Sequence, residues 1–181
     1  YLNLVLGCDI PPFNDVRVRK ALALAIDRPQ LTEIVLEGLG APAYDNPVSP
    51  AYRFYSKTPE RSQDIEQAKK LLAEAGYANG VDLLLHAAER PGSRETLAVA
   101  VKEMAAPAGF RITVQRDPYD TYLAQVWKKA NFYVGLYNMQ PSIDSLMYLL
   151  YTSSASWNET RWNNVEVDQV VQAARAATEE A

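Results

Sequence analysis

The chain has 181 residues, of which 48% are hydrophobic and 22% charged, a composition typical of a globular domain that can bury a sizeable core. Its net charge is −4 and no basic block is present, which argues against a nucleic-acid partner. No run of 18 apolar residues occurs, so the sequence predicts no transmembrane segment.

The sequence offers little for metal or redox chemistry. Cys8 is the only cysteine and His86 the only histidine, which excludes an internal disulfide and argues against a metal site of the zinc type. The tetrapeptide ending at Cys8 superficially resembles a lipoprotein cleavage box, but neither a basic region nor an adequate apolar segment precedes it. We therefore predict a buried thiol in or after a strand, a packed or edge histidine, and no cofactor.

The chain opens with a predicted strand and helix. Residues 1–7 alternate and are rich in Leu and Val, which favours a strand. Pro11 and Pro12 end it, because proline donates no ladder hydrogen bond, and Asn14 or Asp15 then provides a helix N-cap. The core-facing stripe of this helix consists of Val18, Ala21, Leu22 and Ala25.

A second helix, a long irregular segment and a third helix follow. Asp27 can cap the second helix, predicted over residues 30–39 with Leu31, Ile34 and Val35 facing inward. Residues 41–61 are rich in proline, tyrosine and serine, and long ordered segments of this kind are often functional. Residues 64–75 predict a helix with apolar residues along one face.

Strands and helices then alternate. The predicted strands cover residues 81–87, 110–116 and 132–137, and the first is apolar enough to be buried on both faces. Ser93 is placed to cap the helix after the first strand, and Pro118 opens the helix after the second. This rhythm implies right-handed parallel crossovers and therefore an α/β sheet with helices on both faces.

The last third is predicted to hold a short helix over residues 143–151, a polar segment with two tryptophans, and a final helix. That helix has a stripe formed by Val167, Val170, Val171 and Ala174, and no stop signal precedes Ala181. A chain that begins in a strand and ends in a helix is expected to be cut at both ends.

Several stretches resemble those of one known family. They are PPFNDVRVRKALALAIDR from Pro11, DIEQAKKLLAEAGYANGVDL from Asp64, KANFYVGLYNMQPSIDSLMYLLYT from Lys129 and NETRWNNVEVDQVV from Asn158. They resemble family 5 of the extracellular solute-binding proteins of ABC transporters, the group that binds oligopeptides, dipeptides and nickel. The resemblance covers essentially the whole chain.

The resemblance implies a bilobal type II periplasmic-binding-protein fold, in which a mixed, largely parallel sheet carries helices on both faces of each lobe. It implies that residues 1–181 form a single domain, the C-terminal ligand-binding lobe, without its partner lobe. It further implies capture of a peptide or peptide-like solute between the lobes and delivery to the membrane permease of an ABC importer. The expected location is periplasmic or extracytoplasmic, at the cell envelope.

The candidate site follows the third strand of the alternating region. In open α/β sheets, ligands bind beyond the carboxyl ends of strands, where Tyr137, Asn138, Met139 and Gln140 fall. The resemblance aligns Met139 with an aspartate that pairs with the peptide α-ammonium group in peptide-binding relatives. That anchoring charge is absent here. Asp144 could replace it from the following turn, although an N-cap role is favoured.

Trp157, Asn158 and Arg90 complete the candidate ligand-binding set. Aromatic faces beside hydrogen-bonding amides suit sugars, opine-like conjugates or capped peptides as well as peptides, and a metal chelate is a further alternative. Trp157 and Trp162 could equally pack in the core under the last helix. Arg90 lies just past the 81–87 strand and could meet an anionic ligand group, although a free surface arginine is the favoured interpretation.

The sequence also bears on two other classes of protein, enzymes and flavodoxin-like domains. The G-x-S-x-G, H-E-x-x-H, G-x-G-x-x-G and P-loop patterns are missing, so the sequence predicts no catalytic residues and no enzyme. A flavodoxin-like regulatory or interaction domain would show the same strand–helix alternation. A phospho-acceptor domain needs an acidic pocket at the carboxyl ends of its strands, whereas Asp82 lies at the start of one.

Overall fold

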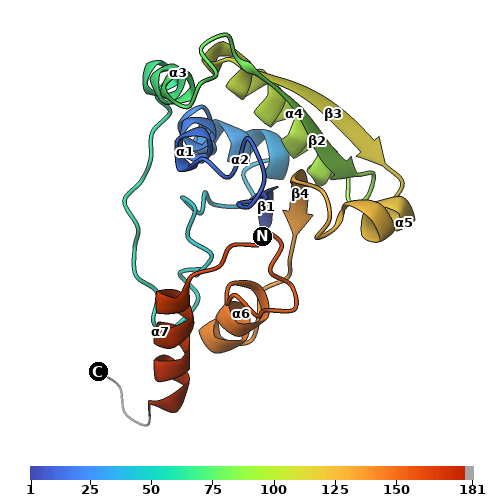
Figure 1. Cartoon of the computed structure of the whole chain (residues 1–181). Coiled ribbons are helices and arrows are strands. Elements are labelled where there is room, and N and C mark those ends of the chain that lie inside the picture. Colours follow the sequence, from blue (N-terminus) through green and yellow to red (C-terminus); the bar gives the residue numbers. More distant parts are fainter. Residues whose placement is uncertain (178–181) are drawn as a thin grey trace.

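The computed structural model describes residues 1–177. Within them, four strands form one sheet in the order β1-β4-β2-β3. Its members are β1 (Leu2–Leu6), β2 (Val81–Ala88), β3 (Phe110–Asp117) and β4 (Phe132–Leu136). Figure 1 shows that β2 and β3 run side by side at one edge and that β1 and β4 lie at the other.

The three later strands are parallel, as the strand–helix alternation predicts. Val81 pairs with Phe110 and the register continues to Ala88 and Asp117, while β4 joins β2 at the His86–Tyr133 pair. The connections are α4 (Ser93–Ala105), the short helix η1 (Ala106–Ala108), and α5 (Tyr119–Thr121) continued by the π-helical η2 (Tyr122–Val126). All three predicted strands therefore lie in one sheet.

The first strand makes the sheet mixed. β1 runs antiparallel to β4, with Leu2 opposite Leu136 and Leu6 opposite Phe132. Because side chains alternate across a strand, Leu2, Leu4 and Leu6 pack on the main core whereas Val5 faces η2 on the opposite side. Helices thus cover both faces of the sheet around β1 and β4.

Aspartates cap the helices that the sequence predicts in the first half. Asp15 accepts the backbone N–H of Arg17 at 2.8 Å at the start of α1 (Val16–Leu24). At the start of α2 (Arg28–Leu36) the Asp27 side chain accepts the Gln30 backbone N–H, and at the start of α3 (Ile65–Glu74) Asp64 accepts that of Gln67. Each cap satisfies an N–H group that the first turn leaves unpaired, which fixes where the helix begins.

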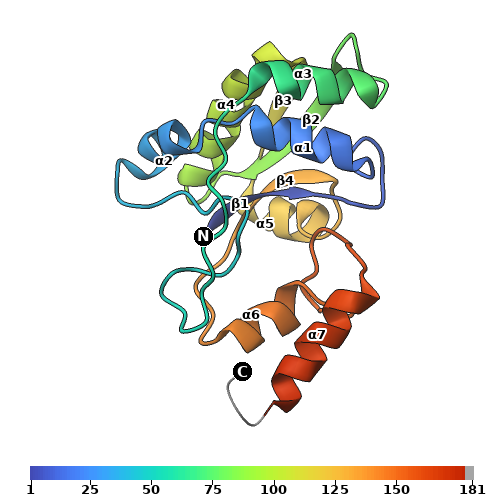
Figure 2. The ribbon, with the colours of Figure 1, turned by 90° about the vertical axis from the view of Figure 1, so that its left-hand side faces the viewer.

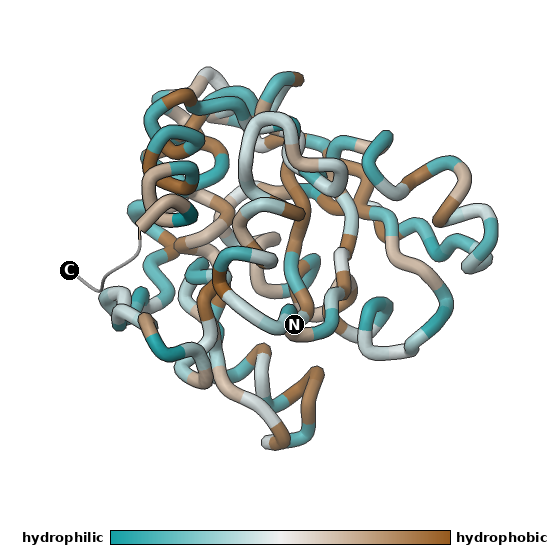
Figure 3. The backbone as a smooth tube through the Cα atoms, turned by 90° about the horizontal axis from the view of Figure 1, so that it is seen from below, coloured by the Kyte–Doolittle hydropathy of each residue, from teal (hydrophilic) through white to brown (hydrophobic). Residues whose placement is uncertain are grey.

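The main core lies between the sheet and helices α1, α3 and α4. Leu22 of α1 is 2% exposed, and the Phe13 ring packs on Phe132 of β4 with 5.0 Å between centroids. Further buried members of this core are Val18, Leu72, Leu85, Val101, Phe110 and Val134. In Figure 3 hydrophobic and hydrophilic stretches alternate along the helices, as expected for helices buried on one side.

Four local predictions are wrong. Leu84 is 48% exposed, so β2 is not buried on both faces, because η2 covers only the part of the second face near β4. Ile34 is 45% exposed and faces away from the core. The N-cap of α4 is Gly92, which makes no side-chain hydrogen bond, and not the predicted Ser93. The N-cap of α6 (Ile143–Leu150) is Ser142, and not Asp144.

A second tier lies beyond the carboxyl end of β4. It contains α6 (Ile143–Leu150), α7 (Val165–Ala176) and the irregular residues 41–61 (Figure 2). Tyr52 from the irregular segment is buried against Leu146 and Leu150 of α6. The predicted stripe of the last helix is only partly right, since Val171 is buried but Val170 is 68% exposed. α7 ends at Ala176, and the predicted continuation to Ala181 falls on residues 178–181, outside the described chain.

None of the described helices is long and apolar enough to cross a membrane.

Candidate functional site

The chain leaves β4 at Leu136 and runs without regular structure to the start of α6. Tyr137 and Gln140 are half-buried, Asn138 is exposed, and the Met139 side chain is 57% exposed. The backbone carbonyl of Gln140 accepts the Tyr52 hydroxyl at 2.7 Å, which ties this segment to residues 41–61. Four neighbouring predicted residues therefore lie together at the carboxyl end of the strand.

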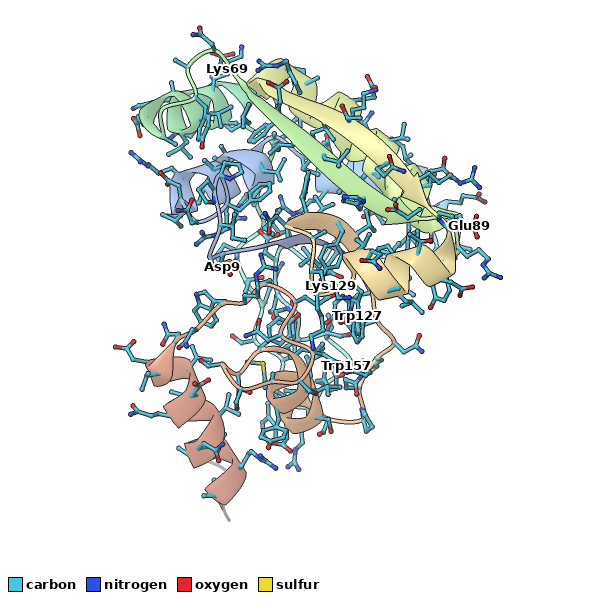
Figure 4. All side chains as sticks on the ribbon, turned by 45° about the vertical axis from the view of Figure 1, so that its right-hand side comes forward. Asp9, Lys69, Glu89, Trp127, Lys129 and Trp157 are labelled. Carbon is cyan, nitrogen blue, oxygen red and sulfur yellow. The ribbon has the colours of Figure 1, made fainter. Side chains whose placement is uncertain are left out.

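Four rings form what we call the aromatic wall: Tyr1, Trp127, Tyr137 and Trp157. Tyr137 lies between Tyr1 and Trp157, with centroid distances of 5.9 Å and 5.7 Å. Trp127 meets Trp157 edge-on at 5.9 Å and donates from Nε1 to the Tyr137 hydroxyl at 3.1 Å. Figure 4 shows Trp127 and Trp157 close together between α5 and α6. The predicted pair Tyr137 and Trp157 thus meets in space.

A buried carboxyl group lies behind this wall. Glu159 is 6% exposed, and its Oε1 accepts the Tyr133 hydroxyl at 3.0 Å. Burial raises the pKa of Glu159, while hydrogen bonding from Tyr133, Tyr137 and Trp127 opposes that rise. Burial and the nearby carboxyl group raise the pKa of Tyr133 as well. The site therefore contains a titratable acid that solvent barely reaches.

The remaining candidates have other partners. The Asn158 side-chain amide donates to the backbone carbonyls of Trp162 at 2.7 Å and Thr152 at 3.3 Å, so it holds its own loop together. Asp144 pairs with Arg175 of α7 at 2.9 Å, and Trp162 is 36% exposed. Asn158 is thus close to the wall in sequence, but its amide donors are occupied by the backbone.

Arg90 lies in a different part of the molecule. Its guanidinium sits over the Tyr119 ring at 5.4 Å, and its Nε is 4.0 Å from the Glu89 carboxylate. In Figure 4 the neighbouring Glu89 lies at the far end of β2, away from Trp157. The structure therefore does not bring Arg90 to the aromatic wall.

The histidine and the cysteine also have partners. His86 Nδ1 lies 2.8 Å from the Asp117 carboxylate, and the half-buried Cys8 thiol donates to the Leu6 carbonyl at 3.5 Å.

A groove of about 880 Å³ lies elsewhere, between α2 and α4. Ile34, Ile65, Val99 and Met104 line it, with Glu95 and Glu103 at the polar positions. None of the predicted site residues borders this groove. It is open and lies among the exposed sides of its helices, so we do not assign the candidate site to it.

Sequence reasoning missed Glu159, Trp127, Tyr133 and Tyr52. These residues come from a loop, a turn, a strand interior and the irregular segment, where no periodic pattern marks a shared position. A charged residue directly after Trp157-Asn158 was the one available signal for Glu159. Within residues 1–177, no group of three His, Cys, Asp or Glu side chains is arranged to hold a metal ion.

A mixed α/β sheet with aromatic and amide side chains beyond a strand end is an arrangement in which small ligands are commonly bound. The chain belongs to the bacterial extracellular solute-binding proteins of family 5, since the sequence model of that family, described as "Bacterial extracellular solute-binding proteins, family 5 Middle", matches residues 1–160. This membership sets the flavodoxin-like alternative aside. The homologues in the family are solute-binding proteins that act outside the cytoplasm.

Among known proteins, the chain is 43% identical over 72 residues to the heme-binding protein A of Haemophilus influenzae, covering 39% of this chain and 13% of that protein. It is 26% identical over 159 residues to the glutathione-binding protein GsiB of Escherichia coli K12, covering 84% and 31%. The solved structure of AgaA from A. tumefaciens R10 with agropinic acid matches with a TM-score of 0.85 and 25% identity, covering 99% of this chain and 38% of AgaA. The chain thus spans at most about a third of these curated relatives.

Proposed function

We propose that residues 1–181 form one domain, the C-terminal lobe of a bilobal solute-binding protein, and that the whole protein captures a small solute for an ABC importer. The proposal places it in the periplasm or another extracytoplasmic space, with a membrane permease and the missing lobe as partners. Family membership supports this proposal. The aromatic wall at the carboxyl end of β4 supports the position of the cleft.

The ligand that we propose is a peptide or peptide-like solute without strict dependence on a free amino terminus. The observation that carries this proposal is Met139, a thioether that is 57% exposed two residues after Tyr137, at a position where a carboxylate would serve an ammonium group. Tyr137, Asn138, Gln140 and Trp157 would contact the solute through ring faces and amides. Asn158 would shape the loop, and Arg90 would meet a distant anionic end of a longer solute.

An opine is the second candidate, because a structure 25% identical to this chain holds agropinic acid. Opines combine an amino-acid part with a sugar-derived chain, so amides and aromatic faces suit them too. Sugars and metal chelates remain further alternatives. We propose binding without turnover in every case, in line with the solute-binding homologues.

The full-length protein tests the proposal. Solute released by denaturing the freshly purified protein is identified by mass spectrometry. Titration calorimetry then compares a tripeptide, its N-acetylated twin, glutathione and agropinic acid. We expect at least one of these to bind, with little difference between the tripeptide and its acetylated twin. If no small molecule co-purifies and none of the four binds, the proposed function is wrong.

A further inference from the structure

Two chains of hydrogen bonds lie near the Glu159 carboxyl group, and the first ends on it. In the first, the backbone N–H of Lys128 donates to the Tyr133 hydroxyl at 3.0 Å, and that hydroxyl donates to Glu159 Oε1 at 3.0 Å. Because the Tyr133 oxygen already accepts from Lys128, its own proton is directed at the carboxyl group. The first chain therefore requires an acceptor at Glu159.

The second chain passes through the aromatic wall. Trp127 Nε1 donates to the Tyr137 hydroxyl at 3.1 Å, which leaves the Tyr137 proton free to donate in turn. Hydrogen bonding from Tyr137 and Trp127 lowers the pKa of Glu159 and so favours its acceptor form. The second chain therefore ends at the Tyr137 hydroxyl, which favours the ionised form of Glu159.

Charged and titratable groups surround Glu159 from several elements. Arg94 of α4 is 5% exposed and favours the ionised carboxylate. Tyr122 of η2, together with Tyr1 and Tyr151, faces it as neutral hydroxyl groups whose pKa is raised by burial. Burial works in the opposite sense to Arg94 and is the larger influence, so proton uptake by Glu159 occurs at a higher pH than for an exposed glutamate.

We propose that Glu159 is the positioning residue of the aromatic wall: as an acceptor it fixes the Tyr133 hydroxyl, which accepts the Lys128 N–H beside Trp127, and the turn that carries Glu159 also carries Trp157 two residues earlier. The proposal rests on the proposed function in taking this wall as the solute-facing surface. When the carboxyl group gains a proton, its O–H becomes a donor beside the Tyr133 hydroxyl, which already donates toward it. Either the carboxyl group or the hydroxyl must then reorient, and the contact between Tyr137 and Trp157 loosens.

The test uses the full-length protein without solute. The fluorescence emission of Trp157 is obtained by subtracting the spectrum of the matching Trp157→Phe variant from that of each protein. Spectra are recorded from pH 4 to pH 8, and quenching by acrylamide is measured at each pH. Glu159→Gln keeps an acceptor oxygen but cannot titrate, whereas Glu159→Leu removes the acceptor. Glu166→Gln, at an exposed glutamate in the first turn of α7, is the matched control.

We expect wild type and Glu166→Gln to show a pH transition in Trp157 emission and quenching with a midpoint above that of an exposed glutamate. Glu159→Gln should lack the transition and, because its amide NH2 is a donor like the O–H of the protonated carboxyl group, should show the quenching of the wild-type low-pH form at every pH, and Glu159→Leu should be quenched more than neutral wild type at every pH. An identical pH profile in wild type and Glu159→Gln overturns the proposal, even if Glu159→Leu fails to fold. Since no solute is present, failure of the calorimetric panel would refute the proposed function and leave this result intact.

Discussion

A thioether occupies position 139, where the resemblance to peptide-binding relatives places an aspartate, and its exposure leaves room for a carboxylate. In the full-length protein, Met139→Asp should therefore raise affinity for an unblocked peptide over its acetylated twin. A charge-assisted hydrogen bond contributes about 1.5–3 kcal/mol, which corresponds to roughly ten- to a hundredfold discrimination. Paired titrations of wild type and mutant with both peptides measure it.

Met139→Asn is the control, because it adds an amide of similar shape without the charge. A wild-type protein that already prefers the free amine strongly would contradict our interpretation of Met139. Asp144 would then be the first alternative anchor, and it would have to leave its ion pair with Arg175, 2.9 Å away.

Glu159 should also make stability depend on pH. Its pKa is raised in the folded chain by burial, so its favourable contribution is complete below the unfolded pKa of about 4.3. That contribution is lost as the pH rises through the folded pKa. Glu159→Gln does not titrate, so its melting temperature relative to wild type should increase from pH 4 toward pH 8. A difference that stays constant over this range would show that Glu159 has an ordinary pKa.

For part of the candidate site, the sequence alone predicts the position of the residues in the fold. Tyr137, Asn138, Met139 and Gln140 follow a strand whose end was predictable from Pro141 and from the strand–helix alternation. The contact between Tyr137 and Trp157 was not predictable, since it depends on how the loop after α6 folds back. Glu159 escaped for the same reason: an isolated glutamate in a polar loop gives no sign that it is buried.

Among the elements, α1 carries the clearest prediction about stability. Leu22→Ala should lower the free energy of unfolding by roughly 2–5 kcal/mol, because the side chain is 2% exposed and a cavity would remain. Leu39→Ala is the matched control, since Leu39 is 90% exposed and such surface changes stay within about 0.5 kcal/mol. Denaturant unfolding of both variants measures the difference, and equal values would place Leu22 outside the core.

The elements themselves were largely predictable, because their signals are local. Asp15, Asp27 and Asp64 mark helix starts through a bond to a backbone N–H a few residues later. Leu84 was mispredicted because an apolar strand does not reveal how far the helix on its second face extends. Gly92 replaced Ser93 as a cap because the preceding turn, and not the residue type, fixes where α4 begins.

On the scale of the whole molecule, the described chain presents a wall and no enclosing second surface. Good sites bury roughly 70–90% of a small ligand, and one wall cannot do so. Residues 1–181 alone should therefore bind any solute found for the full-length protein at least about tenfold more weakly. Calorimetry of both proteins with that solute checks this, and equal affinities would contradict the two-lobe proposal.

β1 pairs with β4 although almost the whole alternating region separates them in the chain, and this has a consequence for the order of folding. During synthesis, Leu2–Leu6 is made before Phe132–Leu136 and finds its partner only after that strand exists. The β2–α4–β3 unit needs only local loop closures and can form earlier. In pulse-labelled hydrogen exchange, the amides of β2 and β3 should therefore gain protection before those of β1, although β1 is made before both of them.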